Sequence, residues 1–234
     1  APFGTAWVNP LTLAVGATCT PSWLPTFGVE PGLAGAVKAL AVYDNGSGPA
    51  LYAGGGFLGT QGGVAANRIA RWDGTSWSAL GSGTNNVVTA LAVYDDGSGP
   101  ALYAGGDFTL AGGAAASNIA KWDGWSWSAL GSGVSGGSSS FRVRALAVYD
   151  DGSGPALYVG GAFTTAGGVP ANGIAKWDGS SWSALGSGMN DTVATLSVYD
   201  DDGGAALYAG GSFTSADGIA ANRIAKWDGS SWSP

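Results

Sequence analysis

The amino-acid sequence predicts an all-β protein assembled from repeated units of four short antiparallel strands. The segment Leu-Tyr-(Ala/Val)-Gly-Gly-x-Phe occurs four times, at residues 51–57, 102–108, 157–163 and 207–213. A Val-Tyr-Asp segment precedes each copy, and its tyrosines recur about every fifty residues, which indicates a repeat architecture. The chain is rich in Gly (43 residues) and Trp (11) and only 11% charged. Helical proteins instead contain much Glu, Lys and Leu, so the composition favours strands and turns.

The second unit shows the expected first hairpin. Residues 90–94 form an apolar run typical of a strand, and residues 101–104 form another. Between them lies Asp-Asp-Gly-Ser-Gly-Pro, a turn sequence, because Gly permits positive φ and Pro stops strand pairing. Gly105 and Gly106 then allow a close approach of another backbone, and we expect Phe108 to supply bulk to the core.

The same unit continues with a crossing loop and a second hairpin. Residues 110–117 are rich in Gly and Ala and predict a loop that leads to a third strand at 119–122. Asp123-Gly124 is a strong hairpin signal before a fourth strand at 127–130. Gly-Ser-Gly at 131–133 then leads to the next unit.

Four short antiparallel strands per unit are what the blade of a β-propeller requires, because radial packing covers the sheet faces that one blade leaves open. A parallel β-helix is the alternative, but its rungs are usually shorter and do not need four turns per repeat. We therefore expect one propeller domain. Its four clear repeats cover about residues 36–83, 84–133, 134–188 and 189–234.

Residues 1–35 depart from the repeat and are expected to form a degenerate N-terminal blade or closing strands. Residues 6–9, 13–15 and 22–25 resemble the second, third and fourth strands of a unit. Five blades are therefore favoured. A four-bladed ring with an added outer strand and a fragment of a longer array are the alternatives.

Composition excludes several classes of function. The net charge of −7 with nine basic residues argues against nucleic-acid binding, and no apolar run approaches the ~20 residues that cross a bilayer. Cys19 is the only cysteine and the chain has no histidine, which argues against an intrachain disulfide, zinc sites and redox chemistry. We expect no cofactor. The opening at Ala1 is compatible with a mature exported protein, and an extracellular or cell-surface location is expected.

Several of these residues resemble the kelch repeat family. Gly105-Gly106, Trp122-Asp123 and Trp127 occupy the places of its double glycine, its Tyr-Asp-like pair and its fourth-strand Trp, and the likeness covers about residues 36–232. It is greatest to Gly- and Trp-rich arrays of secreted or surface-attached bacterial proteins. The resemblance implies a propeller but not a function, since kelch-like propellers include enzymes, lectins and protein-binding modules. Kelch-like copper oxidases use His ligands and a Cys-modified Tyr, so that activity cannot be transferred to this chain. The Asp box of sialidase-like propellers separates Asp from Gly by one residue, whereas they are adjacent here.

The candidate binding face is formed by the connections from second to third strands and from fourth to first strands. Recurring Asn residues there act either as turn caps, which is favoured, or as hydrogen-bonding groups for a sugar. Trp and Tyr residues that recur in register are expected in the core, whereas Trp125 and Phe141 occur once and are candidate exposed contacts. The candidate ligand-binding residues are Asn67, Arg68, Asn118, Trp125, Phe141, Arg142, Arg144, Asn172, Asn222 and Arg223.

The Asp-rich hairpin tips raise a calcium alternative, although Asp and Gly are common turn formers and the integrin-like Asp-x-Asp-x-Asp-Gly loop is absent. Turn formation is the favoured interpretation. The residues concerned are Asp95, Asp96, Asp150, Asp151, Asp200, Asp201 and Asp202.

The sequence shows no catalytic constellation. There is no His base, Glu30 is the only glutamate, and the aspartates recur at turns in every unit, which a single active site does not require. Glycoside hydrolysis by two aspartates stays open as an alternative. We expect a non-catalytic, secreted or surface-exposed binding module for carbohydrate or protein. A structural or self-assembling scaffold, natural or engineered and without a small ligand, is the alternative.

Overall fold

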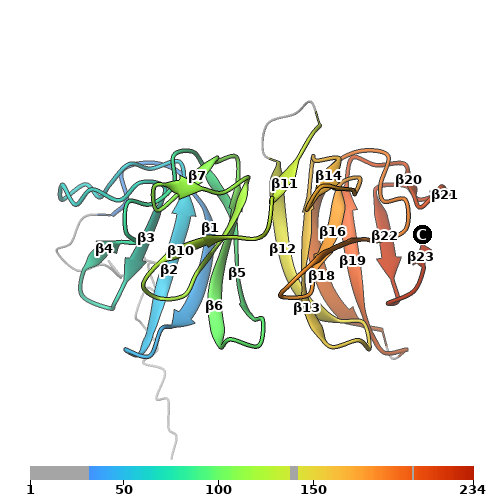
Figure 1. The fold of residues 1–234 in the computed structure, drawn as a ribbon, viewed down its shortest axis with the longest axis horizontal. Coiled ribbons are helices and arrows are strands. Elements are labelled where there is room, and N and C mark those ends of the chain that lie inside the picture. The colour runs from blue at the N-terminus through green and yellow to red at the C-terminus, as the bar shows by residue number, and fades with distance from the viewer. Residues whose placement is uncertain (1–31, 138–141, 202) are drawn as a thin grey trace, which may run out of the picture.

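The protein is all-β throughout the part that the structure describes. The computed structural model describes residues 32–137, 142–201 and 203–234, which contain twenty-three strands and no helix. None of these residues therefore belongs to a helix long and apolar enough to cross a bilayer. Sixteen of the strands form four separate four-stranded antiparallel sheets, one in each sequence repeat (Figure 1).

Within each sheet the four strands pair antiparallel in chain order, so every connection joins neighbours. Sheet 1 contains β1 (Val37–Asp44), β2 (Pro49–Gly55), β3 (Ile69–Trp72) and β4 (Trp77–Ala79). Sheet 2 contains β5 (Val88–Asp95), β6 (Pro100–Gly106), β9 (Ile119–Trp122) and β10 (Trp127–Ala129). Sheet 3 contains β12 (Val143–Asp150), β13 (Pro155–Gly161), β16 (Ile174–Trp177) and β17 (Trp182–Ala184). Sheet 4 contains β18 (Val193–Asp200), β19 (Ala205–Gly211), β22 (Ile224–Trp227) and β23 (Trp232–Ser233).

The stretch between second and third strands is not the plain loop that the sequence predicts. In sheet 2 it contains a small hairpin, because Gly112 and Gly113, at φ of +62° and +85°, form a two-residue turn that lets the flanking residues pair. The linker before sheet 3 adds a short strand that pairs with the equivalent hairpin there. The short strands are β7 (Leu110–Ala111), β8 (Ala114–Ala115), β11 (Val134–Ser135), β14 (Thr165–Ala166), β15 (Val169–Pro170), β20 (Ser215–Ala216) and β21 (Ile219–Ala220).

The first strand of every sheet, which is also its innermost strand, contains a β-bulge opposite the double glycine. In sheet 2, Val88 pairs with Gly106 and Ala90 pairs with Gly105, which leaves Thr89 as the extra residue. The second glycine is required because another backbone passes close by: a Cβ on Gly106 would lie 2.0 Å from the carbonyl oxygen of Val87. The extra residues of the four bulges are Lys38, Thr89, Arg144 and Ala194.

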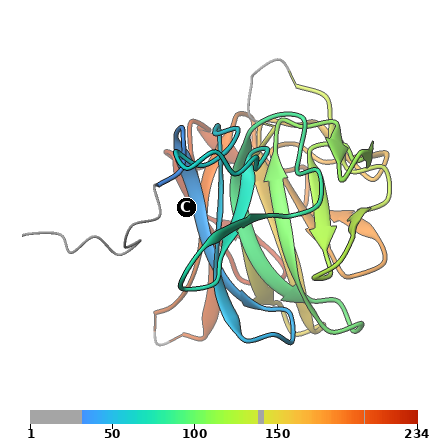
Figure 2. The same ribbon diagram turned by 90° about the vertical axis from the view of Figure 1, so that its left-hand side faces the viewer.

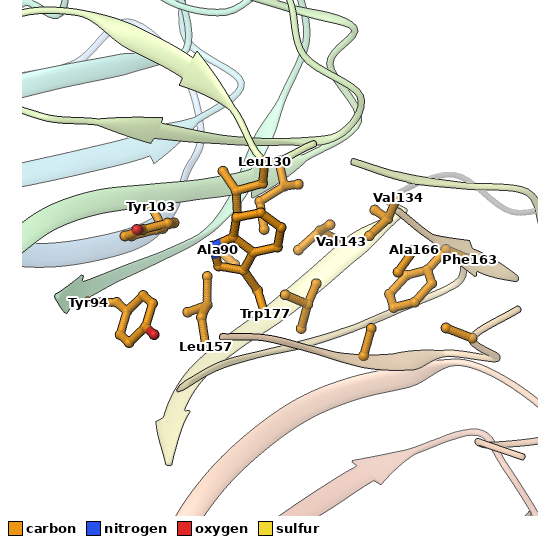
Figure 3. Packing of buried hydrophobic residues seen from close by; sticks show 14 of the residues in the cluster. Ala90, Tyr94, Tyr103, Leu130, Val134, Val143, Leu157, Phe163, Ala166 and Trp177 are labelled. Atoms are coloured by element: carbon orange, nitrogen blue, oxygen red, sulfur yellow. The ribbon is translucent and has the colours of Figure 1, made fainter. Parts of the chain in front are cut away.

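Neighbouring sheets pack face to face through their innermost strands, in the order β1, β5, β12, β18 (Figures 1 and 2). Figure 3 shows the junction of sheets 2 and 3, where Trp177 and Leu157 of one sheet meet Tyr94, Tyr103 and Leu130 of the other. The recurring Tyr and Trp residues are largely buried in the core, which confirms the expectation from their register. Within the described residues, no comparable contact joins β1 to β18.

Three tyrosine hydroxyls cross the junctions in the same way. Each donates a hydrogen bond of 3.0 Å to a backbone carbonyl at the start of the second strand of the next sheet. A tryptophan indole in the fourth strand donates back to a leucine carbonyl of the preceding sheet, at 2.8 to 3.2 Å. The tyrosine pairs are Tyr43 with Pro100, Tyr94 with Pro155, and Tyr149 with Ala205. The tryptophan pairs are Trp127 with Leu80, Trp182 with Leu130, and Trp232 with Leu185.

The strands expected at residues 6–9, 13–15 and 22–25 lie outside the described residues, as do Phe141 and Asp202. The described chain begins beside sheet 1, where Leu33 forms an isolated antiparallel bridge with Thr60.

Two adjacent glycines of sheet 1 provide a matched test of the close approach. A Cβ on Gly55 would lie 2.0 Å from the carbonyl oxygen of Ala36, whereas one on Gly56 would lie 4.0 Å from it, and Gly56 has no positive φ. We expect Gly55→Ala to lower the free energy of unfolding by about 2 kcal/mol or more and Gly56→Ala to change it by less than about 0.5 kcal/mol. Urea denaturation of both variants measures the difference. Equal effects would contradict the role assigned to the double glycine.

Candidate functional site

The connections predicted to form the binding face do lie together at one end of the molecule. We call this the linker end. It carries the small hairpins between second and third strands and the linkers between sheets, at the top of Figure 1. The tight turns between first and second strands and between third and fourth strands lie at the opposite end, which we call the tip end.

Asparagines in two linkers fasten the linker to the connection between second and third strands of the sheet that follows, and the sequence analysis missed them. The Oδ1 of Asn85 accepts the backbone N–H groups of Thr109 and Leu110, both at 2.9 Å, and its Nδ2 donates to the Thr109 hydroxyl. Asn190 makes the same three bonds, to Thr214 and Ser215. The detectable signal was the motif Gly-Ser-Gly-x-Asn in both linkers, at residues 81–85 and 186–190.

Two pockets open at the linker end, each at a junction between sheets. The pocket between sheets 1 and 2 has a volume of about 300 Å³ and is lined by residues that include Asn67, Arg68 and Asn85. The pocket between sheets 3 and 4 has a volume of about 210 Å³, and its lining includes Asn172 and Asp191. The structure therefore brings predicted site residues to equivalent pockets at two junctions.

Three of the predicted asparagines occupy one register, just before the third strand. The Nδ2 of Asn67 donates to the carbonyl oxygen of Ser82, and the Nδ2 of Asn172 donates to that of Ser187, both at 3.0 Å. Asn222 is the exposed counterpart in sheet 4. These bonds tie the start of the third strand to the following linker, fifteen residues further along the chain, whereas the sequence analysis favoured a local turn cap.

Asn118 occupies a different position of the repeat, directly before the third strand, and shares this register with Arg68 and Arg223. All three have a positive φ, between 66° and 70°, and the fourth residue of this register is Gly173, at 70°. The left-handed region is uncommon for side chains other than Gly and Asn, so two arginines there store strain of about 1 kcal/mol or more each. Arg68 Nη1 donates to the carbonyl oxygen of Gly56 at 3.3 Å, and Arg223 Nη1 donates to that of Ser212 at 3.2 Å. Asn118 Nδ2 bonds to the carbonyl oxygen of Val134.

Three other predicted residues, Arg144, Trp125 and Arg142, line neither of the linker-end pockets. Arg144 was expected at the linker face, but it is the bulge residue of β12, and it lines a central pocket of about 340 Å³ with Lys38, Thr89 and Ala194. The bulge turns each of these side chains toward the common centre of the innermost strands. Trp125 lies at the tip end, in the turn between β9 and β10, and is 82% exposed. Arg142 immediately precedes β12, where its backbone N–H donates to Asp107 Oδ1.

The aspartates proposed for calcium are used in the turns at the tip end. Asp95 Oδ1 accepts the N–H groups of Gly97 and Gly99, Asp150 does the same with Gly152 and Gly154, and Asp200 accepts the N–H of Gly204. The described residues contain no group of three or more His, Cys, Asp or Glu side chains placed to hold a metal ion. These bonds account for the recurrence of Asp by turn geometry.

The second aspartate of each tip is held by a lysine and a tyrosine. Asp96 Oδ2 accepts hydrogen bonds from Lys121 Nζ and from the Tyr103 hydroxyl, the latter at 2.9 Å. Burial alone would raise the pKa of Asp96, but the bonds from Lys121, Ser98 and Tyr103 outweigh it and hold that pKa well below its usual range. Burial and the bond to Asp96 raise the pKa of Tyr103. Asp151 and Asp201 repeat the arrangement with Lys176 and Lys226.

A further aspartate closes the turn between third and fourth strands in each sheet. Hydrogen bonds from Ser76 and Thr75 hold the pKa of Asp73 well below its usual range, and those from Ser181 and Ser180 do so for Asp178. These carboxylates are exposed, so their bonds act locally on the turn.

Comparison with known proteins assigns no family: no protein-family model and no curated protein sequence matches this chain.

Acidification is expected to destabilise the protein. The pKa values of Asp73, Asp96 and Asp178 are lower in the folded state than the ~3.9 of an unfolded aspartate, so the unfolded chain binds more protons at low pH. The free energy of unfolding should be level from about pH 5.5 to pH 8, because the chain has no histidine, and should fall below about pH 4. Urea midpoints across this range measure it. Asp178→Asn, which does not titrate, should make the acid limb shallower; a midpoint unchanged down to pH 2.5 would refute the assignment.

The strain at Arg68 can be measured separately from its side-chain bond. Arg68→Ala and Arg68→Gly both remove the guanidinium, but only glycine relieves the left-handed backbone. We expect the Gly variant to be about 1 kcal/mol more stable than the Ala variant. Lys121, with no positive φ, provides the control, since its Gly variant should be the less stable of the same pair. Equal stability of the two Arg68 variants would argue against strain.

Proposed function

We propose that the chain is a non-catalytic, secreted or surface-exposed binding module of the kelch-like β-propeller type, and that its ligand is a carbohydrate bound at the linker end. The four repeated sheets would be blades. Two observations support the propeller: all four innermost strands contribute to the lining of one central pocket, and successive sheets pack through the same strands. The number of blades in the ring, favoured as five, belongs to the same proposal.

The observation that carries the binding function is the pair of pockets at the linker end. They occupy equivalent junctions. Both are lined by hydrogen-bonding groups of the two positions that precede the third strand, Asn67 and Arg68 in one pocket and Asn172 and Gly173 in the other. Their volumes, about 210 and 300 Å³, lie at or below the ~300 Å³ lower limit of drug-sized ligand sites. A single sugar ring suits such a pocket better than a large cofactor does, and repeated shallow sites suit a multivalent glycan.

The left-handed backbone of Arg68 supports a binding site at the linker end. A left-handed arginine persists only where the surrounding structure holds it, and such residues cluster at ligand sites. Arg68 lies in the wall of the pocket between sheets 1 and 2, where the residue is half-buried. Guanidinium groups donate several hydrogen bonds in a fixed plane, which suits the hydroxyls or carboxylates of sugars.

The second candidate is the structural scaffold. It is favoured by a separate observation, the apolar side chains of sheets 1 and 4 that no other described residue covers.

A glycan array, probed with the purified chain with and without calcium, tests the binding function. We expect reproducible binding that does not require calcium. A variant with Arg68→Gly and Asn172→Ala changes both pockets and should lose about tenfold or more in affinity, because hydrogen bonds to a charged group are lost. Trp125→Ala, at the tip end, is the matched control and should bind like the wild type. A blank array, or loss of binding in the Trp125 variant alone, would refute binding at the linker end.

A further inference from the structure

Sheet 1 lacks the carboxylate that the other three sheets hold at the tip end. In those sheets the second aspartate of the tip, such as Asp96, accepts hydrogen bonds from a tyrosine and from the lysine that lies opposite that tyrosine in the third strand. In sheet 1 the aspartate is replaced by Asn45 and the lysine by Arg71, which lies opposite Tyr52. A cation is therefore retained where the anion that pairs with it elsewhere is absent.

Asn45 does not replace the missing acceptor. Its Oδ1 accepts the backbone N–H of Ser47 at 3.3 Å and the Ser47 hydroxyl at 2.7 Å, as Asp96 Oδ1 does with Ser98. The other branch of the asparagine is the Nδ2 amide, which only donates, whereas Asp96 presents Oδ2 there. Sheet 1 therefore has no equivalent of the carboxylate oxygen that binds the lysine and the tyrosine.

Tyr52 and Arg71 show the consequence. The Tyr52 side chain is fully buried, and neither its hydroxyl nor the Nε of Arg71 has a hydrogen-bond partner among the described residues. Burial raises the pKa of Tyr52, and the positive charge of Arg71 in the facing strand opposes that shift. Buried polar groups nearly always have a partner, so this exception points to a group from outside the described fold.

An exposed tryptophan lies beside the same tip. Gly124 packs on Asn45, since a Cβ on that glycine would lie 2.9 Å from Asn45 Cβ. Trp125 follows Gly124 directly and is 82% exposed. The other sheets hold small hydroxyl residues at this position, Thr75, Ser180 and Ser230. Three departures from the repeat, at residues 45, 71 and 125, therefore lie at one junction of the tip end.

The neighbouring carboxylates do not exclude an anion from this junction. Asp44 and Asp123 are each held by backbone N–H groups of their own turns, at 2.7 to 2.9 Å. Asp95 and Asp178 hold the same two positions around Asp96, whose pKa is nevertheless well below its usual range. A carboxylate is therefore stable in this setting when a cation faces it.

We propose that the tip of sheet 1, through Arg71 and Trp125, binds an acidic segment of a protein partner. A partner Asp or Glu carboxylate would pair with the Arg71 guanidinium in place of the missing tip aspartate, and an apolar side chain next to it would pack on the Trp125 indole. A guanidinium holds a carboxylate through two parallel hydrogen bonds. This inference goes beyond the binding function proposed above, since it concerns the opposite end of the molecule and does not depend on a carbohydrate.

The exposure of Trp125 favours a protein partner over a small molecule. Small-molecule sites bury most of the ligand surface, whereas four-fifths of this side chain is open to solvent. Trp and Arg are the residues that most often contribute the binding energy of protein interfaces, where a partner surface covers them. A carboxylate within a peptide segment meets both requirements.

A displayed library of random short peptides tests the inference. Selection on the wild-type chain is carried out with an excess of the soluble Asn45→Asp variant, which removes peptides that bind elsewhere. In that variant the carboxylate of the repeat is restored, so Arg71 should be paired as Lys121 is in sheet 2. We expect the enriched peptides to contain Asp or Glu next to an apolar residue and to bind with a Kd below about 0.1 mM. Salt near 0.15 M screens the net charge of −7 beyond about 8 Å.

Matched variants locate the contact. Arg71→Gln and Trp125→Ala should each weaken binding of an enriched peptide about tenfold or more, and so should exchange of its acidic residue for the amide. Lys121→Gln is the control, because it removes the equivalent cation of sheet 2, whose partner Asp96 lies within the chain. The inference is overturned if no peptide is enriched, if the enriched peptides lack acidic residues, or if Lys121→Gln weakens binding as much as Arg71→Gln.

The urea midpoint separates a lost contact from a folding defect. Asn45→Asp should raise the midpoint, because it supplies the acceptor that Tyr52 and Arg71 lack among the described residues. Trp125→Ala should leave the midpoint unchanged, since the side chain is largely exposed. A lower midpoint in Asn45→Asp would contradict the missing carboxylate and overturn the inference. Glycan binding at the linker end should be the same in all these variants, which separates this result from a failure of the binding function.

Discussion

The close approach of the innermost strand to the double glycine is the constraint on which the rest of the structure depends. The second glycine admits the carbonyl of the residue that precedes the innermost strand, and the bulge that follows adds one residue to that strand. The first glycine then remains open on its other side, where the valine of the next sheet packs directly on it. One Gly-Gly pair therefore fixes the bulge, the direction of the central side chains and the spacing between sheets.

The hydrogen bonds between sheets follow from that spacing. With valine seated on glycine, the tyrosine hydroxyl reaches the first carbonyl of the next second strand, and the fourth-strand indole reaches back to a leucine carbonyl. Without these bonds each group would be a buried polar atom that lacks a partner. Leaving such a group unsatisfied lowers the free energy of unfolding by more than the bond itself contributes. Junctions of this kind make the sheets interdependent: a sheet is complete only when both of its faces are covered by neighbours of the same type.

Much of this could be predicted from local sequence. Strand 119–122 was placed correctly, because Asp-Gly and the preceding loop mark its ends, and the Asp-rich tips were recognised as turns. The small hairpins were missed because the alternation of Gly and Ala carries little apolar pattern. Asn118 was grouped with Asn67 although it lies one residue before Ile119 and Asn67 lies two residues before Ile69, a difference that the sequence does show. The place of Arg144 in a β-bulge was not predicted, since a bulge changes the direction of a side chain without changing residue spacing. The relation between the first and last sheets depends on the angle between sheets, which no local pattern encodes.

The two ends of the molecule differ in what their polar groups do. At the tip end, carboxylates are used by their own turns and by a lysine and tyrosine of the same sheet. The sequence there repeats with little change apart from Asn45, Arg71, Trp125 and the Asp-Gly-Gly-Ala of residues 202–205. At the linker end, one left-handed register carries Arg, Asn, Gly and Arg on the same backbone, and the linker before sheet 3 is longer than the others. A backbone held constant while its side chains vary is the usual setting of a binding surface. Of the four residues of that register, Arg68 and Gly173 line the two linker-end pockets, so the proposed binding function would give these two pockets different walls on the same backbone.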